Sequence, residues 1–162
     1  MRVISGIARG RKLKEPDSHI IRPTTDKTKE SIFNIVQFDI EGRRVLDLFA
    51  GTGQLGTEAL SRGAKSVVFV DSAKESVNLI RENLKTCGFS DLSGIFAIDA
   101  LRYLENDEKF DLVFIDPPYD TLLADRAISL IVKFDKLNKN GIIILESKAD
   151  SNSDSSATVL IN

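Results

Sequence analysis

Short apolar runs recur along the chain from residue 43 onward, separated by segments with helical spacing. Five runs predict β-strands: RVLDLF (44–49), SVVFV (66–70), GIFAI (94–98), DLVFI (111–115) and GIIILES (141–147). Most positions in each run are apolar, which is typical of strands buried on both faces of a sheet. Helices are expected after each of the first four strands. The pattern therefore predicts an α/β fold, a doubly wound, mostly parallel sheet with helices on both faces.

The N-terminal stretch follows a different pattern. RVISGIARGRKLKEP predicts a β-hairpin in which VISGI is one strand and Gly10 permits the turn. A loop follows, and Thr25 or Asp26 is a suitable N-cap for the next helix. We therefore predict a hairpin and loop extension at residues 1–25 and a main domain at residues 26–162.

Composition suits a single domain, because the chain has 162 residues of which 42% are hydrophobic and 28% charged. The only cysteine, Cys87, excludes an internal disulfide and a cysteine metal cluster, and we expect no metal. No apolar run is long enough to span a membrane, and the N-terminus lacks the apolar core of a signal peptide. We therefore expect a cytoplasmic protein with no membrane partner.

Charge is distributed unevenly, although the formal net charge is only −2. Residues 1–30 hold eight Lys or Arg against four Asp or Glu, whereas the remainder holds fourteen against twenty. The first fourteen residues carry five basic side chains and no acidic one. This asymmetry indicates a basic arm on a mildly acidic body.

The segment DLFAGTGQLG places Gly51, Gly53 and Gly56 between a predicted strand and a predicted helix, in the pattern G-x-G-x-x-G. Glycines permit a tight turn and let a ligand approach the backbone, and the helix N-terminus attracts negative groups. Asp71 ends the next strand, where a carboxylate can bind the ribose hydroxyls of an adenosine. This segment is a candidate cofactor loop; the alternative is a strand-to-helix turn without a ligand.

The glycine pattern alone fits NAD, FAD and S-adenosylmethionine. Asp47 favours the last, because an anion near the loop repels a pyrophosphate and attracts the ammonium of a methionine moiety. Asp99 follows the third strand and has two open interpretations. It can accept a hydrogen bond from an adenine amino group, or it can cap the short helix that follows.

A second candidate site follows the fourth strand, in the run Asp116, Pro117, Pro118 and Tyr119. Two prolines fix the backbone and remove two N–H donors, which leaves groups that accept hydrogen bonds. The first and fourth strands are neighbours where a doubly wound sheet reverses its strand order. We therefore expect this loop and the glycine loop to open into one crevice.

This second loop suits an exocyclic amine as nucleophile. The Asp116 carboxylate and the Pro117 carbonyl can each accept one N–H, which holds the nitrogen for attack on a sulfonium methyl group. Asp116 can stabilise the positive charge that develops on the nitrogen, and whether it also takes the proton stays open. Tyr119 can stack on the base, a contact worth about 1–3 kcal/mol. The alternative is a rigid connection without a substrate.

Together these motifs resemble those of known enzymes. [DNS]-P-P-[YF] with D-x-F-x-G-x-G is similar to class I S-adenosylmethionine-dependent methyltransferases that act on nucleobase amines. More narrowly, ISGIARGRKL, RPTTDKTKESIFNI, VLDLFAGTGQLGTEALSRGA and FIDPPY, in that order over about residues 2–146, resemble the RsmD family. The resemblance implies a Rossmann-like methyltransferase fold, S-adenosylmethionine as cofactor, and methylation of the exocyclic N2 amine of a guanine. Its substrate would be 16S ribosomal RNA or an assembling small ribosomal subunit, and we expect a monomer.

The resemblance also implies roles for individual residues. The cofactor-binding residues would be Arg22, Thr24, Thr25, Asp47, Phe49, Gly51, Gly53, Asp71, Asp99 and Ala100. The catalytic residues that hold the guanine would be Asp116, Pro117, Pro118 and Tyr119. The RNA-binding residues would be Arg2, Arg9, Arg11 and Lys12, for which a solvated surface hairpin is the alternative.

One departure from the family pattern follows the fifth strand, where family members continue through a reversed strand pair. Here only SKADSNSDSSATVLIN remains, so we expect the last hairpin to be shortened or missing. Three other functions stay open. DNA adenine-N6 methylation shares the chemistry, an NAD-dependent oxidoreductase has no use for DPPY, and a non-catalytic RNA-binding or assembly module needs only the fold.

Overall fold

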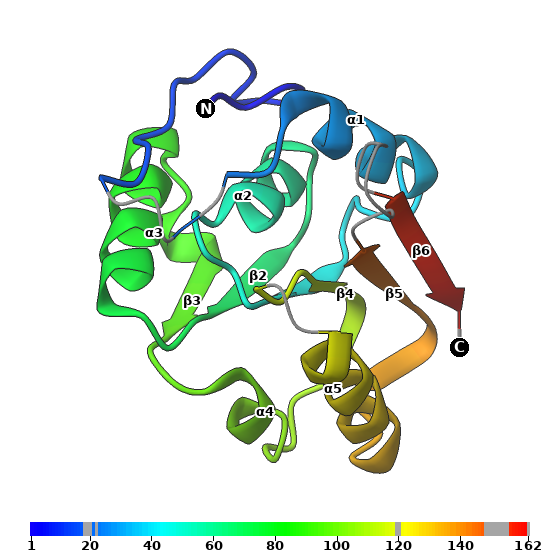
Figure 1. Cartoon of the computed structure of the whole chain (residues 1–162). Helices are drawn as coiled ribbons and strands as arrows, with labels where there is room; N and C mark the ends of the chain where they lie inside the picture. The colour runs from blue at the N-terminus through cyan, green and yellow to red at the C-terminus, as the bar shows by residue number, and fades with distance from the viewer. Residues whose placement is uncertain (18–20, 22, 119–120, 148–155, 162) are drawn as a thin grey trace.

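Six strands form one sheet in the order β3–β2–β1–β4–β5–β6 (Figure 1). The structure is a computed structural model that describes residues 1–17, 21, 23–118, 121–147 and 156–161. The strands are β1 (Arg44–Leu48), β2 (Ser66–Val70), β3 (Ser93–Phe96), β4 (Phe110–Ile115), β5 (Leu137–Ser147) and β6 (Ser156–Ile161). The first five are parallel, and β6 pairs antiparallel with β5. The predicted mostly parallel sheet is therefore confirmed.

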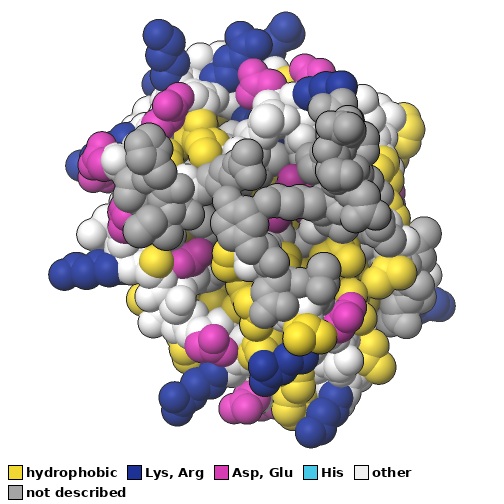
Figure 2. Space-filling model, viewed as in Figure 1, with side chains coloured by type: hydrophobic (Ala, Val, Ile, Leu, Met, Phe, Trp, Pro, Cys, Tyr) yellow, Lys and Arg dark blue, Asp and Glu magenta, His cyan; other side chains and the backbone are white. Residues whose placement is uncertain are grey.

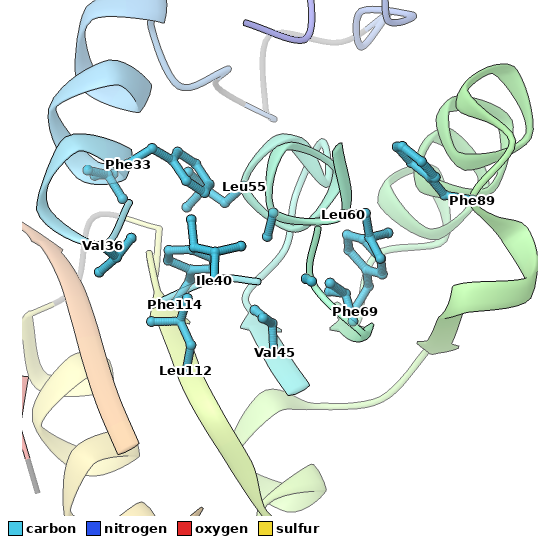
Figure 3. Packing of buried hydrophobic residues seen from close by; sticks show 14 of the residues in the cluster. Phe33, Val36, Ile40, Val45, Leu55, Leu60, Phe69, Phe89, Leu112 and Phe114 are labelled. Carbon is cyan, nitrogen blue, oxygen red and sulfur yellow. The ribbon is translucent and has the colours of Figure 1, made fainter. Parts of the chain in front are cut away.

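Helices cover both faces of this sheet (Figure 1). One face carries α1 (Asp26–Ile35), α2 (Gln54–Ser61) and α3 (Lys74–Cys87), and the other carries α4 (Ala100–Tyr103) and α5 (Thr121–Lys133). A short 3-10 helix, η1 (Ser90–Leu92), precedes β3. Alternate residues of each strand supply the two apolar cores. In β4, Phe114 packs against Phe33 of α1 with ring centroids 5.6 Å apart (Figure 3), whereas Val113 and Ile115 face α5.

The N-terminal extension folds back on itself as predicted, but among its described residues the strand pairing is one antiparallel bridge between Arg2 and Lys12. Residues 5–10 form bends and turns instead of the predicted strand. The chain bends at Gly6, whose φ is +84° and where an added Cβ would lie 1.8 Å from the Ser61 carbonyl oxygen. The strand does not extend because the amides of this stretch bond to α2 rather than to a second strand.

At the other end of the sheet, the described residues form one reversed strand after β5, and the shortened or missing last hairpin stays a prediction. This strand, β6, pairs with β5 from Ile142↔Ile161 to Ser147↔Ser156. Among the described residues, no helix has the length and apolar character that a membrane crossing requires.

Candidate active site at the carboxyl edge of the sheet

The two loops that carry chemistry leave the same edge of the sheet. β1 and β4 are adjacent and parallel, and Leu48 pairs with Ile115 in the last register position of each. The glycine loop, residues 49–53, follows Leu48 directly, and the DPP loop, residues 116–118, follows Ile115 directly. The juxtaposition that the strand pattern predicted is present.

The glycine loop has a conformation that few other sequences can adopt. Phe49, Gly51 and Gly53 all have positive φ, at 61°, 55° and 73°. A phenylalanine in this region is unusual, and such strain is typical of functional loops. At Gly53, the N-cap of α2, an added Cβ would lie 2.8 Å from Cγ1 of Ile80. Position 53 is buried and has no room for a side chain, and it begins a helix whose N-terminus favours a negative group.

Gly56 has a packing role rather than a binding role. An added Cβ would lie 2.3 Å from the Phe69 ring, so α2 lies directly on β2. The amide of Gly56 donates a 2.9 Å hydrogen bond to Asp47, which is only 2% exposed beneath the loop. Contact of Asp47 with the methionine end of a cofactor stays a prediction.

The carboxylates at this edge act on one another. Burial raises the pKa of Asp47 well above its ordinary value near 3.8. The Gly56 N–H opposes this rise, and the negative charges of Asp116 and Asp71 add to it. Asp116 and Asp71 therefore lie near enough to act on Asp47, and negative charge at this edge favours a cationic ligand.

Asp71 is tied to the glycine loop itself. Its Oδ2 accepts a 2.9 Å hydrogen bond from the Gly51 amide, and its Oδ1 accepts one of 2.9 Å from Ala73. The side chain is half-buried, and each carboxylate oxygen has a second lone pair for a ribose hydroxyl. Ribose binding by Asp71 stays a prediction that the geometry permits.

Asp99 adopts the capping geometry that was one of its two interpretations. Its Oδ1 accepts a 3.0 Å hydrogen bond from the Arg102 amide at the start of α4. Ala100 behind it is buried, whereas Asp99 is exposed.

Phe96, at the end of β3, is 46% exposed and packs on Tyr103 with ring centroids 5.1 Å apart. An exposed aromatic ring at this edge was not predicted, because its position in an apolar run resembles a core position.

The segment before α1 lies over the glycine loop. Ile21 Cγ2 lies 3.7 Å from the position that a Cβ on Gly51 would occupy. The Thr24 carbonyl accepts a 3.3 Å hydrogen bond from the side chain of Gln54, a buried residue that the motif did not single out. Thr25 caps α1 through a 3.2 Å bond from the Thr28 amide. Arg22 lies outside the described residues.

In the DPP loop, Asp116 and Pro117 are half-buried and Pro118 is exposed. Tyr119 lies outside the described residues, so its predicted stacking role stays a prediction. The negative charge of Asp116 contributes to the raised pKa of Asp47, so the DPP loop and the residues beneath the glycine loop influence one another. What the DPP loop binds stays a prediction.

The predicted RNA-binding residues lie on the N-terminal extension. Arg9, Arg11 and Lys12 are exposed, whereas Arg2 donates a 3.2 Å hydrogen bond from Nε to Asp26 of α1. Figure 2 shows Lys and Arg side chains along the upper edge of the molecule, where Figure 1 places this extension and α1. The four residues therefore do not act alike: three extend into solvent and one also fastens the extension to α1.

Comparison with known proteins adds a family context. The family model described as Conserved hypothetical protein 95 matches residues 1–161. Ribosomal RNA small subunit methyltransferase D of Haemophilus influenzae is 40% identical over 154 residues, 93% of this chain and 80% of that protein. The protein of the same name from Escherichia coli K12 is 34% identical over 152 residues, 93% of this chain and 76% of that one. The solved structure of the yhhF protein of Escherichia coli has a TM-score of 0.84 at 33% identity, covering 93% and 82% of the two chains.

Proposed function

Because the chain belongs to the RsmD family, whose model is described as Conserved hypothetical protein 95, we propose that it methylates small-subunit ribosomal RNA. The methyl group comes from S-adenosylmethionine, and its acceptor is the exocyclic N2 amine of a guanine. The observation that carries this proposal is the meeting of the glycine loop and the DPP loop at one sheet edge. A methyl donor bound by the first loop then faces an amine bound by the second.

The residues of the glycine loop suit this cofactor. The N-cap of α2 is Gly53, which has no side chain to cap the helix, and the helix N-terminus favours a carboxylate. Asp71 offers acceptors for ribose hydroxyls, and Asp47 adds negative charge beneath the loop wherever it is ionised. When bound, S-adenosylmethionine supplies an electrophilic methyl group on a positively charged sulfur. A negative region is favourable for this cation and unfavourable for a pyrophosphate.

Asp116 and Pro117 position the nucleophile. The amino nitrogen of a nucleobase is nearly planar, and two acceptors on its two N–H groups favour localisation of the lone pair. The Asp116 carboxylate and the Pro117 carbonyl are such acceptors, and the prolines hold both in a fixed backbone. Asp116 then stabilises the positive charge that develops on the nitrogen, with the other carboxylates of the edge adding to its field.

The N-terminal extension supplies the RNA contact in this proposal. Arg9, Arg11 and Lys12 are exposed and carry positive charge on an otherwise mildly acidic molecule. Phosphate contacts of this kind give affinity and fix the register of an RNA without reading its bases. The guanine itself is then selected at the DPP loop.

Methyl transfer to small ribosomal subunits tests the proposal. Particles from a strain that lacks the enzyme are incubated with tritium-labelled S-adenosylmethionine and either the wild type or Asp116→Ala. We expect label in the RNA with the wild type and little with the variant, and nucleoside analysis should recover N2-methylguanosine. Asp125→Ala, which removes an exposed carboxylate of α5, serves as the matched control and should label normally.

Other outcomes would point elsewhere. Equal labelling by wild type and Asp116→Ala would remove Asp116 from the mechanism. Recovery of N6-methyladenosine would show that the methyl acceptor is an adenine rather than a guanine. RNA binding without incorporation of label would favour a non-catalytic RNA-binding module.

A further inference from the structure

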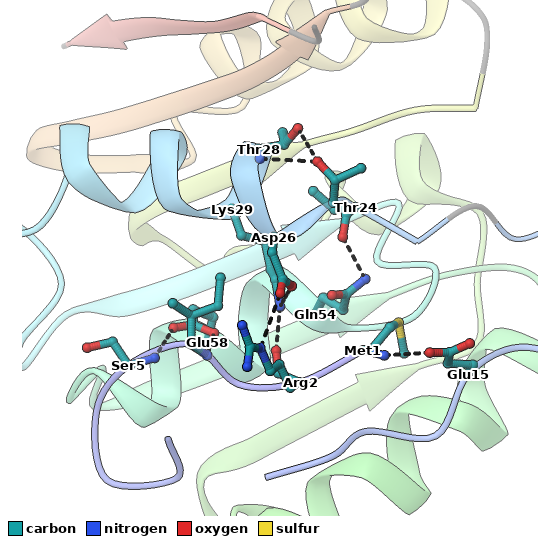
Figure 4. A network of polar contacts seen from close by, with 12 residues as sticks. Met1, Arg2, Ser5, Glu15, Thr24, Asp26, Thr28, Lys29, Gln54 and Glu58 are labelled. Atoms are coloured by element: carbon teal, nitrogen blue, oxygen red, sulfur yellow. Dashed lines mark hydrogen bonds and ion pairs between the residues drawn. The ribbon is translucent and has the colours of Figure 1, made fainter. Parts of the chain in front are cut away.

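The N-terminal loop, residues 4–11, is fastened to the side chain of one buried carboxylate on α2. Glu58 is only 1% exposed, and each of its oxygens accepts a 2.9 Å hydrogen bond from this loop. Oε2 accepts from the Ile4 amide, and Oε1 from the Ser5 amide. Figure 4 shows Glu58 and Ser5 in this contact, within a network of polar side chains that surrounds the extension.

A second residue of α2, Ser61, forms hydrogen bonds with the next turn of the loop. Its hydroxyl donates to the Ser5 carbonyl at 2.6 Å and accepts from the Ala8 amide at 2.9 Å. Its own carbonyl accepts from the Ile7 amide at 2.8 Å. Four of the five amides between residues 4 and 8 therefore bond to Glu58 or Ser61, which leaves this part of the loop little conformational freedom.

Two cationic side chains, one buried and one half-buried, also contribute to the attachment. Lys29 of α1 is fully buried and donates a 2.6 Å hydrogen bond to the Arg2 carbonyl, just ahead of the loop. Arg62 donates to Glu58 at 2.9 Å, and its guanidinium lies 4.6 Å from the centre of the Phe33 ring. The carboxylate of Glu58 thus accepts three hydrogen bonds, and such bonding is the condition under which a buried charge is tolerated.

A buried ion pair such as this one is weak evidence for a role in stability alone. Apolar side chains of similar volume often stabilise a protein as well as buried ions do, whereas buried ions can specify one conformation. The conformation specified here presents Ile7, which is 85% exposed, together with the exposed side chains of Arg9 and Arg11. A loop that is already ordered loses less entropy when it binds a partner.

The same helix also carries the cofactor loop. α2 has eight residues; Gly53 caps its N-terminus, while Glu58 and Ser61 lie in its second half. All eight residues of α2 are buried, so the helix is fixed within the first core. The basic loop and the glycine loop are therefore attached to a common rigid support.

We propose that Glu58 is a positioning residue for RNA binding, which holds the basic N-terminal loop at a fixed place relative to the methyl-transfer site. This inference rests on the proposed function. Glu58 touches neither substrate nor cofactor; it acts through the backbone of Ile4 and Ser5. Ser61 is its partner in this role.

The test compares Glu58→Gln with Glu82→Gln. Glutamine keeps the shape of Glu58 but presents an NH₂ group to one of the loop amides, which breaks a hydrogen bond. Glu82 is a matched control because it is exposed on α3 and meets the extension only through the Lys14 side chain. Ser61→Ala is a second test variant that introduces no change of charge. For each protein, the measurements are amide hydrogen exchange, affinity for small-subunit RNA, affinity for S-adenosylmethionine, and the KM and kcat of methyl transfer.

We expect faster exchange at Ile4 and Ser5 in Glu58→Gln, and at Ala8 in Ser61→Ala. The KM for RNA should rise on the order of three- to tenfold in both, as expected when a binding loop must be ordered on contact. Affinity for S-adenosylmethionine and kcat at saturating RNA should be unchanged, and Glu82→Gln should match the wild type.

Faster exchange with an unchanged KM for RNA would overturn the inference, as would an equal loss of affinity for both substrates. A wild type that binds the RNA but transfers no methyl group would overturn the proposed function alone. Absence of RNA binding by the wild type would overturn both.

Discussion

The carboxylate of Asp71 accepts a 2.9 Å hydrogen bond from the backbone amide of Gly51, twenty positions earlier in the chain. The contact joins the end of β2 to the loop after β1, so it fixes the conformation of the glycine loop. The other oxygen of Asp71 accepts from Ala73, which orients the carboxylate from the opposite side. The residue proposed to bind the ribose therefore also shapes the loop that binds the rest of the cofactor.

Asp71→Asn should weaken S-adenosylmethionine binding about tenfold or more. An asparagine side chain offers only one acceptor oxygen, so either the Gly51 amide or the Ala73 amide loses its hydrogen-bond acceptor. A hydrogen bond to a charged group contributes about 1.5–3 kcal/mol. Titration calorimetry with S-adenosylmethionine measures the change. Asp91→Asn, an exposed change in η1, should leave the affinity unaltered. An unaltered affinity in Asp71→Asn as well would show that neither the loop nor the ribose depends on this charge.

Asp47→Asn should remove a pH dependence of stability. The pKa of Asp47 is raised in the folded protein, chiefly by burial, so the folded state keeps a proton that the unfolded chain releases near pH 3.8. Its contribution to stability is fully present below that pH and is lost as the pH rises through the raised pKa. Asparagine still accepts the Gly56 hydrogen bond and does not titrate, so the variant should be the more stable protein at neutral pH.

The measurement is the free energy of unfolding in urea, taken at several pH values from 4 upward for both proteins. The wild-type curve should fall relative to that of the variant as the pH rises. Parallel curves would mean that Asp47 does not titrate in this range. Above the raised pKa of Asp47, the variant should also bind S-adenosylmethionine less tightly than the wild type, because it lacks the carboxylate charge beneath the loop.

The two reactive loops were predictable because their signals are local. Gly51 and Asp116 each stand near the end of an apolar run, and the alternation of strands and helices determines which strand ends share an edge. The capping role of Asp99 was also visible, since a polar residue before a short helix is a common cap. Local pattern could not decide between this cap and an adenine contact.

The attachment of the N-terminal loop was not predictable, because its contacts join distant residues. Glu58 has the sequence context of a solvated helix residue, yet its partners Ile4 and Ser5 lie 54 and 53 positions away. The same contacts explain why VISGI does not extend as a strand. Lys29 is fully buried for a similar reason, since its partner is the backbone of Arg2.

Gly56→Ala should destabilise the protein more than Gly88→Ala. The added methyl group at position 56 would lie 2.3 Å from the fully buried ring of Phe69, and overpacking of this kind costs about 1–3 kcal/mol or more. Gly88 caps α3 with φ +75° and has no heavy atom within 4 Å of an added Cβ, so only backbone strain of about 1–2 kcal/mol applies. Urea unfolding of both variants gives the comparison. Equal losses of unfolding free energy in the two variants would show that α2 can move away from β2 at little cost, contrary to the close contact between Gly56 and Phe69.

Arg9→Glu combined with Arg11→Glu should weaken RNA binding and leave S-adenosylmethionine binding unchanged. Both side chains are exposed on the N-terminal loop and belong to a different segment from the glycine loop. Each phosphate contact adds about 0.7–0.9 to the slope of log affinity against log salt concentration. Loss of two contacts should therefore lower that slope by about 1.4–1.8.

Filter binding of small-subunit RNA over a series of salt concentrations measures this slope. Lys65→Glu with Lys139→Glu is the matched control, because it makes the same change in net charge at exposed sites outside the extension. The control should lower affinity slightly through the general field of the protein and keep the wild-type slope. Equal slopes in all three proteins would mean that the basic loop makes no phosphate contacts, and the RNA would then have to bind through another surface of the molecule.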